Sequence, residues 1–234
     1  MLVRFALGSP ASVFDLTRSE EGALFMWLVE GHYPHVDGVK RFPALFTKLQ
    51  AQAEKKKLAT DVKSTLYRGK VMNWTPEKFL AVIKKGPAFK FKAKSSILSF
   101  TEEATRAVGY ATHDFFGALV CIDKKIGRKN RLVVFNQKII KALKQDPAFG
   151  GSGLSGQREV VVTKDVLPHA RIFVLADLQD MIMKKVNWQS AVRLKTKAKA
   201  SRYLVVDLKT RNAWTTTGSN SSIARVVSAA VANA

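Results

Sequence analysis

Alternation between apolar and polar positions divides the chain into an N-terminal helical part and a longer part rich in short strand-like runs. The stretch RSEEGALFMWLVEG predicts a helix with Ser19 as N-cap, two glutamates in its first turn and Gly31 as its stop. A second helix is expected over PALFTKLQAQAEKKKL. Both helices have an apolar face, which must be buried against the rest of the chain.

From residue 64 onward, apolar and β-branched runs predict short strands separated by short helices. TPEKFLAVIKKG predicts a helix with Thr75 as cap and Pro76 at its first position, and TEEATRAVGY a helix capped by Thr101. Because such helices do not alternate regularly with the strands, an α+β fold is favoured over a doubly wound one. The strand candidates are STLYRGK, AFKFKAK, SILSF, FFGALVCI, RLVVF, REVVVT, RIFVLA and RYLVVDL.

These changes of pattern predict three segments within one domain. Residues 1–63 form an N-terminal helical part of that domain, and residues 64–175 form its core. Residues 176–234 are a basic C-terminal extension or the completion of the core. Net charge follows the same division, with +2, +12 and +7 in the three segments of a chain whose total is +21.

Such a charge attracts nucleic acid, acidic proteins or anionic cofactors. The stretch RLKTKAKASR (193–202), flanked by Trp188 and Tyr203, predicts docking on nucleic acid or on an acidic protein. A solvated basic face is the alternative.

Composition excludes several other classes of protein. Hydrophobic residues make up 47% of the chain, which is typical of a globular protein, and the longest apolar stretches are too short to span a bilayer. The lone Cys121 lies in an apolar run, so we expect a buried thiol, no disulfide framework and a reducing, intracellular site of action. The histidines lack Cys or carboxylate neighbours at ligand spacing, so no metal site is expected.

The segment GGSGLSGQREVVV contains a G-x-G-x-x-G pattern at Gly151, Gly153 and Gly156, with Asp177 at the distance of a ribose-binding carboxylate. A dinucleotide fingerprint requires a strand before the first glycine and a helix after the last. Here a helical pattern up to Gln145 precedes the glycines and three valines follow them, so the order is reversed. The glycines then belong either to a loop without function or to a loop that leads into functional residues at the start of the next strand.

Polar residues in other strand candidates form an ordered set with that segment. Arg68 lies in the first strand, Ser99 and Thr101 share one face of a second, and Gln157 and Glu159 share one face at the start of a later strand. With these residues the chain resembles the ADP-ribosyltransferases of the Arg–Ser–Glu class, which include bacterial toxins and the Mod and Alt enzymes of T-even phages. The matching segments are LYRG, SFTEEATRAVGY and GQREVVV, in the family's order.

The resemblance implies a split β-sandwich of two small sheets, with the N-terminal helices packed on it and residues 64–175 as the catalytic core. In the family, NAD+ binds as co-substrate in a cleft between the sheets, without a metal. The enzyme transfers ADP-ribose to a macromolecular acceptor and releases nicotinamide.

By this resemblance, Arg68 pairs with the NAD+ phosphates, and Gly69 lets its backbone approach the nicotinamide amide. Ser99 positions Glu159 and the nicotinamide ribose, with support from Thr101. The family commonly reads Ser-Thr-Ser where this chain reads Ser-Phe-Thr, so Ser95 and Ser96 are rival candidates for the motif serine. For Arg68, Ser99 and Glu159 the alternative is an ordinary strand position without catalytic function.

Glu159 is implied to accept a hydrogen bond from the ribose 2′-OH and to stabilise the positive charge that develops as nicotinamide leaves. Gln157 stands at the position that helps to choose the acceptor. A glutamine there accompanies asparagine, cysteine or guanine acceptors rather than arginine. Phe149 is expected either as an exposed contact to the acceptor or as a core anchor, and Tyr110 or Phe115 as the ring that stacks on nicotinamide.

The expected partners are a host macromolecule, with transcription and translation proteins among the candidates, and nucleic acid through the basic surface; no membrane is expected. The expected location is the cytoplasm of a host cell, reached by a phage-encoded or delivered enzyme. Two alternatives stay open. One is a basic nucleic-acid-binding protein whose NAD+ site is inactive or accidental, and the other is an NAD+ glycohydrolase with water as acceptor.

Overall fold

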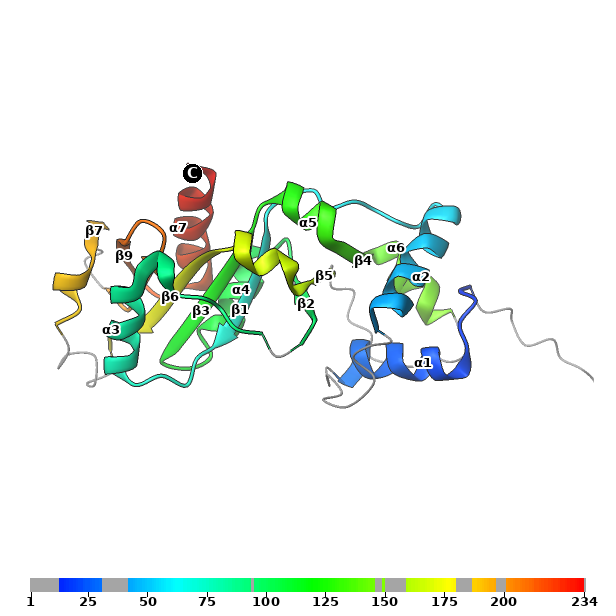
Figure 1. The fold of residues 1–234 in the computed structure, drawn as a ribbon, viewed down its shortest axis with the longest axis horizontal. Coiled ribbons are helices and arrows are strands. Elements are labelled where there is room, and N and C mark those ends of the chain that lie inside the picture. The colour runs from blue at the N-terminus through cyan, green and yellow to red at the C-terminus, as the bar shows by residue number, and fades with distance from the viewer. Residues whose placement is uncertain are drawn as a thin grey trace, which may run out of the picture. The chain divides into compact units, whose positions relative to one another are not determined.

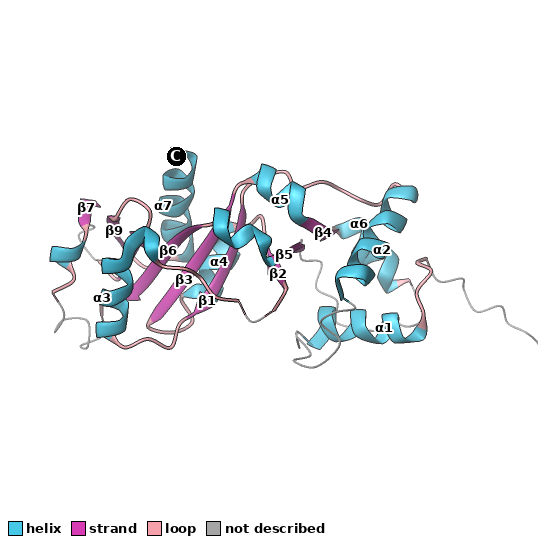
Figure 2. Ribbon diagram, in the orientation of Figure 1, coloured by secondary structure: helices cyan, strands magenta, loops and turns pink. Residues whose placement is uncertain are grey.

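The computed structural model describes residues 13–30, 42–93, 95–145, 149, 159–179, 187–196 and 201–233. The chain forms helices and two small sheets, which confirms the expected α+β class (Figure 1; Figure 2). Within the described ranges, no helix is both long and apolar enough to cross a lipid bilayer.

The chain divides into two compact units. Unit 1 comprises Met1–Asp61 and Arg131–Val161, and unit 2 comprises Val62–Asn130 and Val162–Ala234. This division is not the one expected from the sequence, because residues 131–161 group with the N-terminal helices. The elements of unit 1 are α1 (Arg18–Phe25), a π-helix (Met26–Glu30), α2 (Phe42–Lys55), β4 (Arg131–Phe135), α6 (Gln137–Lys144) and the first residues of β5 (Glu159–Thr163).

Buried aromatic rings form the core of unit 1. Phe46 of α2 stacks on Phe42 with ring centroids 5.6 Å apart and meets Phe135 of β4 edge-on at 5.9 Å. Trp27 of the π-helix packs on Phe42 and Phe46 at 5.6 and 5.0 Å. Since large aromatic side chains bury the most apolar area per residue, this cluster contributes hydrophobic stabilisation between the helices and β4.

Two buried amides join α2 and the chain after it to the segment that begins at β4. Gln50 Oε1 accepts a hydrogen bond from the main-chain N–H of Val134 (3.1 Å). Asn136 caps α6 with its Oδ1, while its Nδ2 donates to the carbonyl of Leu58 (2.9 Å) and to Oγ1 of Thr60 (3.1 Å). A buried amide without partners is costly, so these bonds favour the grouping of residues 131–161 with the N-terminal helices.

The helix caps agree with the sequence at one helix and differ at another. α1 is capped by Thr17, whose Oγ1 accepts from the N–H of Glu20 while the Glu20 side chain accepts from the N–H of Thr17. The predicted cap Ser19 is therefore wrong: a capping box two residues earlier satisfies two N–H groups at once. In unit 2, Thr75 and Pro76 begin a helix as predicted, with Thr75 Oγ1 accepting from the N–H of Lys78.

Unit 2 is built on a six-stranded sheet with the order β1-β3-β6-β8-β9-β7. All neighbours are antiparallel except β7 and β9, which run parallel at the edge. The second sheet has three strands in the order β2-β5-β4, where β2 is Ile97–Phe100. The strands of the larger sheet are β1 (Leu66–Val71), β3 (Phe116–Ile122), β6 (Arg171–Asp177), β7 (Arg193–Thr196), β8 (Tyr203–Asp207) and β9 (Asn212–Thr216).

Helices α4 and α7 cover one face of the six-stranded sheet (Figure 1). Their apolar residues Ala107, Val108, Ile223 and Val227 pack with Phe173 and other buried residues of the strands. The helices of unit 2 are α3 (Pro76–Lys85), α4 (Ala104–Ala111), α5 (Lys124–Asn130) and α7 (Asn220–Ala232), with short 3-10 turns at Gly86–Ala88, Lys164–His169 and Gln189–Ala191.

The strand predicted over residues 88–94 is not formed by residues 88–93. Phe91 is buried with the Lys70 ammonium 5.6 Å from its ring centroid, and Phe89 meets Trp74 edge-on at 6.1 Å. The apolar residues of the alternating pattern therefore anchor an irregular segment. Alternation with period two indicated which side chains are buried, but a strand also needs a partner with which to pair.

Candidate functional site

Arg68 and Ser99, which the resemblance assigns to NAD+ binding, lie together in unit 2. Arg68 is on β1, and its Nη1 donates a hydrogen bond to the main-chain carbonyl of Ser99 on β2 (2.7 Å). Next to this contact, the N–H of Tyr67 donates to the carbonyl of Thr101 (2.7 Å), and the N–H of Thr101 donates back to Tyr67 (2.9 Å). The main chain thus holds β1 and β2 at a fixed separation at the point where the arginine crosses between them.

One donor of the Arg68 guanidinium is buried without a protein partner. Its Nε–H has no hydrogen bond within the described part of the chain. A buried N–H without an acceptor costs about 1–3 kcal/mol. A guanidinium presents its donors as a rigid fork that matches two phosphate oxygens, so a phosphate is one group whose binding would satisfy this N–H.

Of the three candidate serines, Ser99 is the one whose main chain meets Arg68. Ser95 Oγ accepts from the main chain two residues further on, and the carbonyl of Ser96 accepts from the N–H of Lys164 (2.8 Å). Arg68 thus contacts the main chain of Ser99, and the choice of the motif serine among the three stays a prediction.

Thr101 does not cap the helix that follows it. Its Oγ1 accepts from the N–H of Glu103 (3.1 Å), and α4 begins at Ala104 with Glu103 in the N-cap position. The predicted cap at Thr101 is wrong because its hydroxyl closes a local turn before the helix starts. Thr101 is 8% exposed, so its contribution is to the connection between β2 and α4.

Gly69 is required by the packing of α4. A Cβ at this position would lie 1.8 Å from the carbonyl oxygen of Ala107 and 3.0 Å from the main-chain nitrogen of Ala111. The glycine therefore lets the helix backbone contact the strand. Packing against α4 is therefore a structural reason for a glycine at this position. It concerns the side of Gly69 that faces α4, and the expected approach of the Gly69 backbone to a nicotinamide amide stays a prediction.

Tyr110 lies on the opposite side of the sheet from the Arg68 side chain. Successive side chains of a strand point to opposite faces, and Tyr67 and Gly69 face α4, so Arg68 points away from that helix. Tyr110 is on α4 and is 60% exposed. Tyr110 and the Arg68 side chain therefore lie on opposite faces of the sheet, and the stacking of Tyr110 or Phe115 on nicotinamide stays a prediction. Phe115 is also exposed (53%).

Glu159, the expected catalytic carboxylate, begins β5 and is part of unit 1. Its Oε1 accepts a hydrogen bond from the indole Nε1–H of Trp27 (3.1 Å). Trp27 itself is 6% exposed and is fixed by Phe42 and Phe46. The aromatic core of unit 1 thus holds a rigid donor against a partly exposed carboxylate. Sequence reasoning missed Trp27, because no local pattern links it to a residue 132 positions away.

Of the two residues expected to recognise the acceptor, the structure describes Phe149 and not Gln157. Phe149 is fully buried and lies 6.4 Å from the ring of Phe25, so it is the core anchor and not the exposed contact. Gln157 and the glycines of residues 150–156 lie outside the described residues. The order around them is that expected from the sequence, with α6 before and β5 after.

In the described ranges, no group of three or more His, Cys, Asp or Glu side chains could hold a metal ion. Comparisons of the chain with models of known protein families, with curated proteins and with solved structures found no match. Function is therefore inferred from the residues and their surroundings.

Proposed function

We propose that this chain is an NAD+-dependent mono-ADP-ribosyltransferase of the Arg–Ser–Glu class. The observation that carries the proposal is the guanidinium of Arg68, which is fixed on the main chain of Ser99 and keeps a buried Nε–H without a hydrogen-bond partner among the described residues. These two residues stand on the first and second strands, and Glu159 begins the fifth, which is the order that the family resemblance requires. The two small sheets are compatible with the split sandwich that the resemblance implies.

In the proposed reaction, the bond between the nicotinamide nitrogen and C1′ of the ribose breaks, and nicotinamide leaves with the electron pair. A nucleophile of the acceptor forms the new bond to C1′ and loses its proton. Arg68 holds the pyrophosphate, and Ser99 orients the ribose on the nicotinamide side. Glu159 stabilises the positive charge that develops on the ribose, as a carboxylate does in glycoside hydrolysis.

The surroundings of Glu159 suit that electrostatic function. A carboxylate that stabilises a transition state is most effective when it does not have to reorient during the reaction. The Trp27 indole donates to Oε1, which limits rotation of the carboxylate. Trp27 is therefore proposed as a positioning residue for Glu159.

The acceptor in this proposal is a macromolecule, either a protein side chain or a nucleic acid. Gln157 in place of a glutamate argues against arginine as the modified side chain, because an amide cannot remove a proton from a guanidinium. An NAD+ glycohydrolase, in which water takes the place of the acceptor, uses the same residues and differs only in the product.

The test compares labelled NAD+ turnover by the purified chain in bacterial lysate with turnover by Glu159→Gln and Arg68→Lys. We expect Glu159→Gln to lower label transfer by about 100-fold or more while NAD+ binding is retained, as for loss of a group that acts on the transition state. Arg68→Lys should weaken NAD+ binding itself, because an ammonium cannot form the forked contact. Glu77→Gln, which changes an exposed residue of α3, and Arg106→Lys, which changes a half-buried residue of α4, are the matched controls.

Equal label transfer by the wild type and Glu159→Gln would contradict the catalytic assignment. Release of nicotinamide without labelled macromolecule would identify a glycohydrolase. Absence of both NAD+ binding and turnover in the wild type would overturn the proposed function.

A further inference from the structure

The positive charge of the chain is concentrated in unit 2. This unit contains 26 Lys and Arg against 9 Asp and Glu, a net charge of +17, whereas unit 1 contains 13 against 9. An excess of this size raises the energy of the compact state through self-repulsion. A surface on which cations gather without acidic partners therefore needs a functional reason or an anionic partner.

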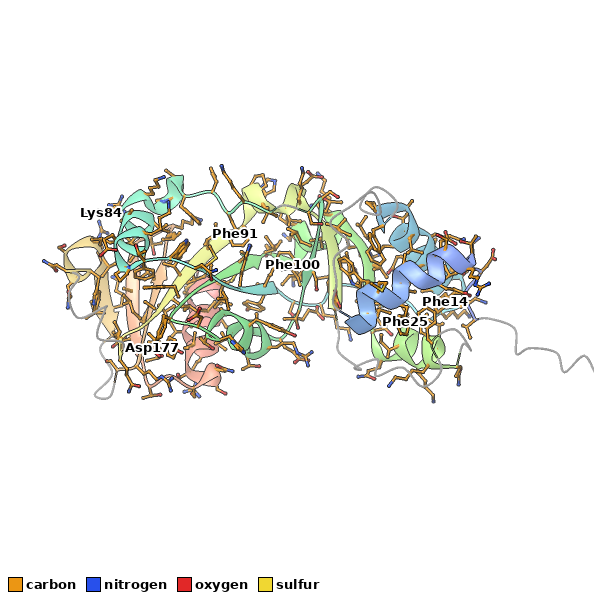
Figure 3. All side chains as sticks on the ribbon, turned by 90° about the horizontal axis from the view of Figure 1, so that it is seen from below. Phe14, Phe25, Lys84, Phe91, Phe100 and Asp177 are labelled. Atoms are coloured by element: carbon orange, nitrogen blue, oxygen red, sulfur yellow. The ribbon has the colours of Figure 1, made fainter. Side chains whose placement is uncertain are left out.

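Cations from three separate segments meet at one end of unit 2. Arg211, in the turn between β8 and β9, donates from Nη2 to the carbonyl of Lys84 at the end of α3 (2.9 Å). The carbonyl of Arg211 accepts from the N–H of Arg193, where β7 begins (2.9 Å). Figure 3 labels Lys84 on α3 beside these strands. We call this surface the basic end; its exposed cations are Lys84, Lys85, Arg193, Lys195, Lys209 and Arg211.

The basic end has no compensating acid among the described residues. None of its six cations forms an ion pair with a described side chain. Residues 187–196 and 208–216 contain no acidic residue. The acid nearest in sequence to Lys209 and Arg211, Asp207, is fully buried and paired with Arg171 through an Nη2–Oδ2 contact of 2.6 Å. The acid of α3, Glu77, lies in its first turn, whereas Lys84 and Lys85 lie in its last.

Local structural reasons explain single cations of the basic end, and they do not explain why all six lie on one surface. Lysines in the last turn of α3 complement the helix dipole. Cations on β7 protect an exposed edge strand from pairing with another chain. Arg211 also satisfies a carbonyl at the end of α3. None of these reasons applies to Lys209, and none requires that the three segments share one end of the unit.

The surroundings of these cations favour a nucleic acid over a protein. Protein interfaces are depleted of lysine and have an apolar, aromatic centre, whereas β7 offers one exposed large hydrophobic residue, Leu194. Nucleic-acid interfaces are polar and strongly cationic. Trp188 and Tyr203, predicted to flank the cationic stretch as stacking residues, are 8% and 5% exposed, so neither ring is presented to a base.

We infer that the basic end binds the sugar-phosphate backbone of a nucleic-acid duplex. Because its contacts are exposed cations without accompanying exposed aromatic rings, binding depends on phosphate spacing and not on base identity. This inference does not rest on the proposed transferase activity. Where both hold, the surface brings a nucleic acid, or a protein bound to one, to the enzyme.

The test measures binding of a DNA duplex of about 20 base pairs as salt is raised from about 50 to about 200 mM. The variant carries Lys84→Gln, Lys85→Gln, Lys195→Gln and Lys209→Gln. Arg211 is kept because its side chain also contacts the chain near Gly86. The matched control carries Lys124→Gln, Lys125→Gln, Lys129→Gln and Lys164→Gln, four exposed lysines of the same unit outside the basic end.

We expect the variant to lose affinity by about tenfold or more, with a salt dependence lower by about one for each phosphate contact removed. The control should keep most of its affinity and its salt dependence, and thermal melting should show both variants folded. Equal losses in variant and control would reduce the effect to net charge and overturn the inference. Unchanged binding by the variant, no binding by the wild type, or equally tight binding of a polyglutamate chain would overturn it as well.

Discussion

The indole of Trp27 donates a hydrogen bond to the carboxylate of Glu159. The contribution of this bond to catalysis can be measured with a substitution that keeps the aromatic core packed. Trp27→Phe removes the Nε1–H donor and keeps an aromatic ring against Phe42 and Phe46. A hydrogen bond to a charged group is worth about 1.5–3 kcal/mol, which corresponds to about tenfold or more in rate. We therefore expect kcat for label transfer to fall by about tenfold or more with little change in KM for NAD+.

The control for this variant is Trp74→Phe, which changes another tryptophan that packs on phenylalanines, here Phe79 and Phe89 of unit 2. Its transfer rate should stay at the wild-type value. A rise in KM with unchanged kcat after Trp27→Phe would indicate a contribution to binding instead, and no change in either constant would remove Trp27 as a positioning residue.

At the scale of elements, the seat of α4 on the six-stranded sheet depends on two glycines. Gly69 on β1 and Gly117 on β3 would each place a Cβ within 2 Å of a carbonyl oxygen of α4, those of Ala107 and Ala111. The neighbouring atoms are main-chain atoms, so the helix itself would have to move. We expect Gly69→Ala to lower the free energy of unfolding by about 1–3 kcal/mol or more, measured by urea denaturation.

Gly22→Ala is the control, because a Cβ at this helical position of α1 meets no atom within 4 Å. Alanine is a better helix former than glycine, so this variant should be neutral or more stable by up to about 1 kcal/mol. A neutral effect of Gly69→Ala would contradict the close seating of α4. If Gly69→Ala instead lowered NAD+ binding without lowering stability, the approach of its backbone to nicotinamide would be the better explanation.

Elements with strong local signals were predictable, and contacts between distant segments were not. Thr75 and Pro76 identified the start of α3, and the apolar run of β3 identified a strand, since each signal lies within a few residues. In α1, the helix begins after Thr17 and not at the predicted cap Ser19, because Thr17 forms a reciprocal bond with Glu20. No pattern in the sequence predicted β7, because its residues are all exposed. The segment is a strand because it pairs with β9.

The candidate site divides in the same way. Arg68, Ser99 and Glu159 could be proposed because each lies in a strand-like run within a recognisable order. Their partners could not be proposed from sequence. The donor to Glu159 lies 132 residues away and the contact between Lys84 and Arg211 spans 127, so each depends on how whole elements pack.

At the scale of the whole molecule, the uneven charge of the two units predicts an uneven response to salt. Repulsion within unit 2, at +17, is relieved when the chain unfolds and the charges separate, so it destabilises the folded state. Raising the salt concentration from about 20 to about 300 mM shortens the screening length to below about 10 Å and weakens this repulsion. We expect the stability of unit 2 to rise with salt more than that of unit 1.

The lone Cys121 offers a direct measurement of this effect in unit 2. It lies on β3, is 2% exposed, and burial raises the pKa of its thiol, so in the folded unit the sulfur is both covered and protonated. Alkylation by the neutral reagent iodoacetamide then requires opening of the unit. The alkylation rate, divided by that of the urea-unfolded chain at the same salt, should fall as salt rises. Hydrogen exchange of peptides from α2 and β4 reports unit 1, where protection should change less. Equal changes in both units, or faster alkylation at high salt, would show that the charge of unit 2 is already compensated in the folded state.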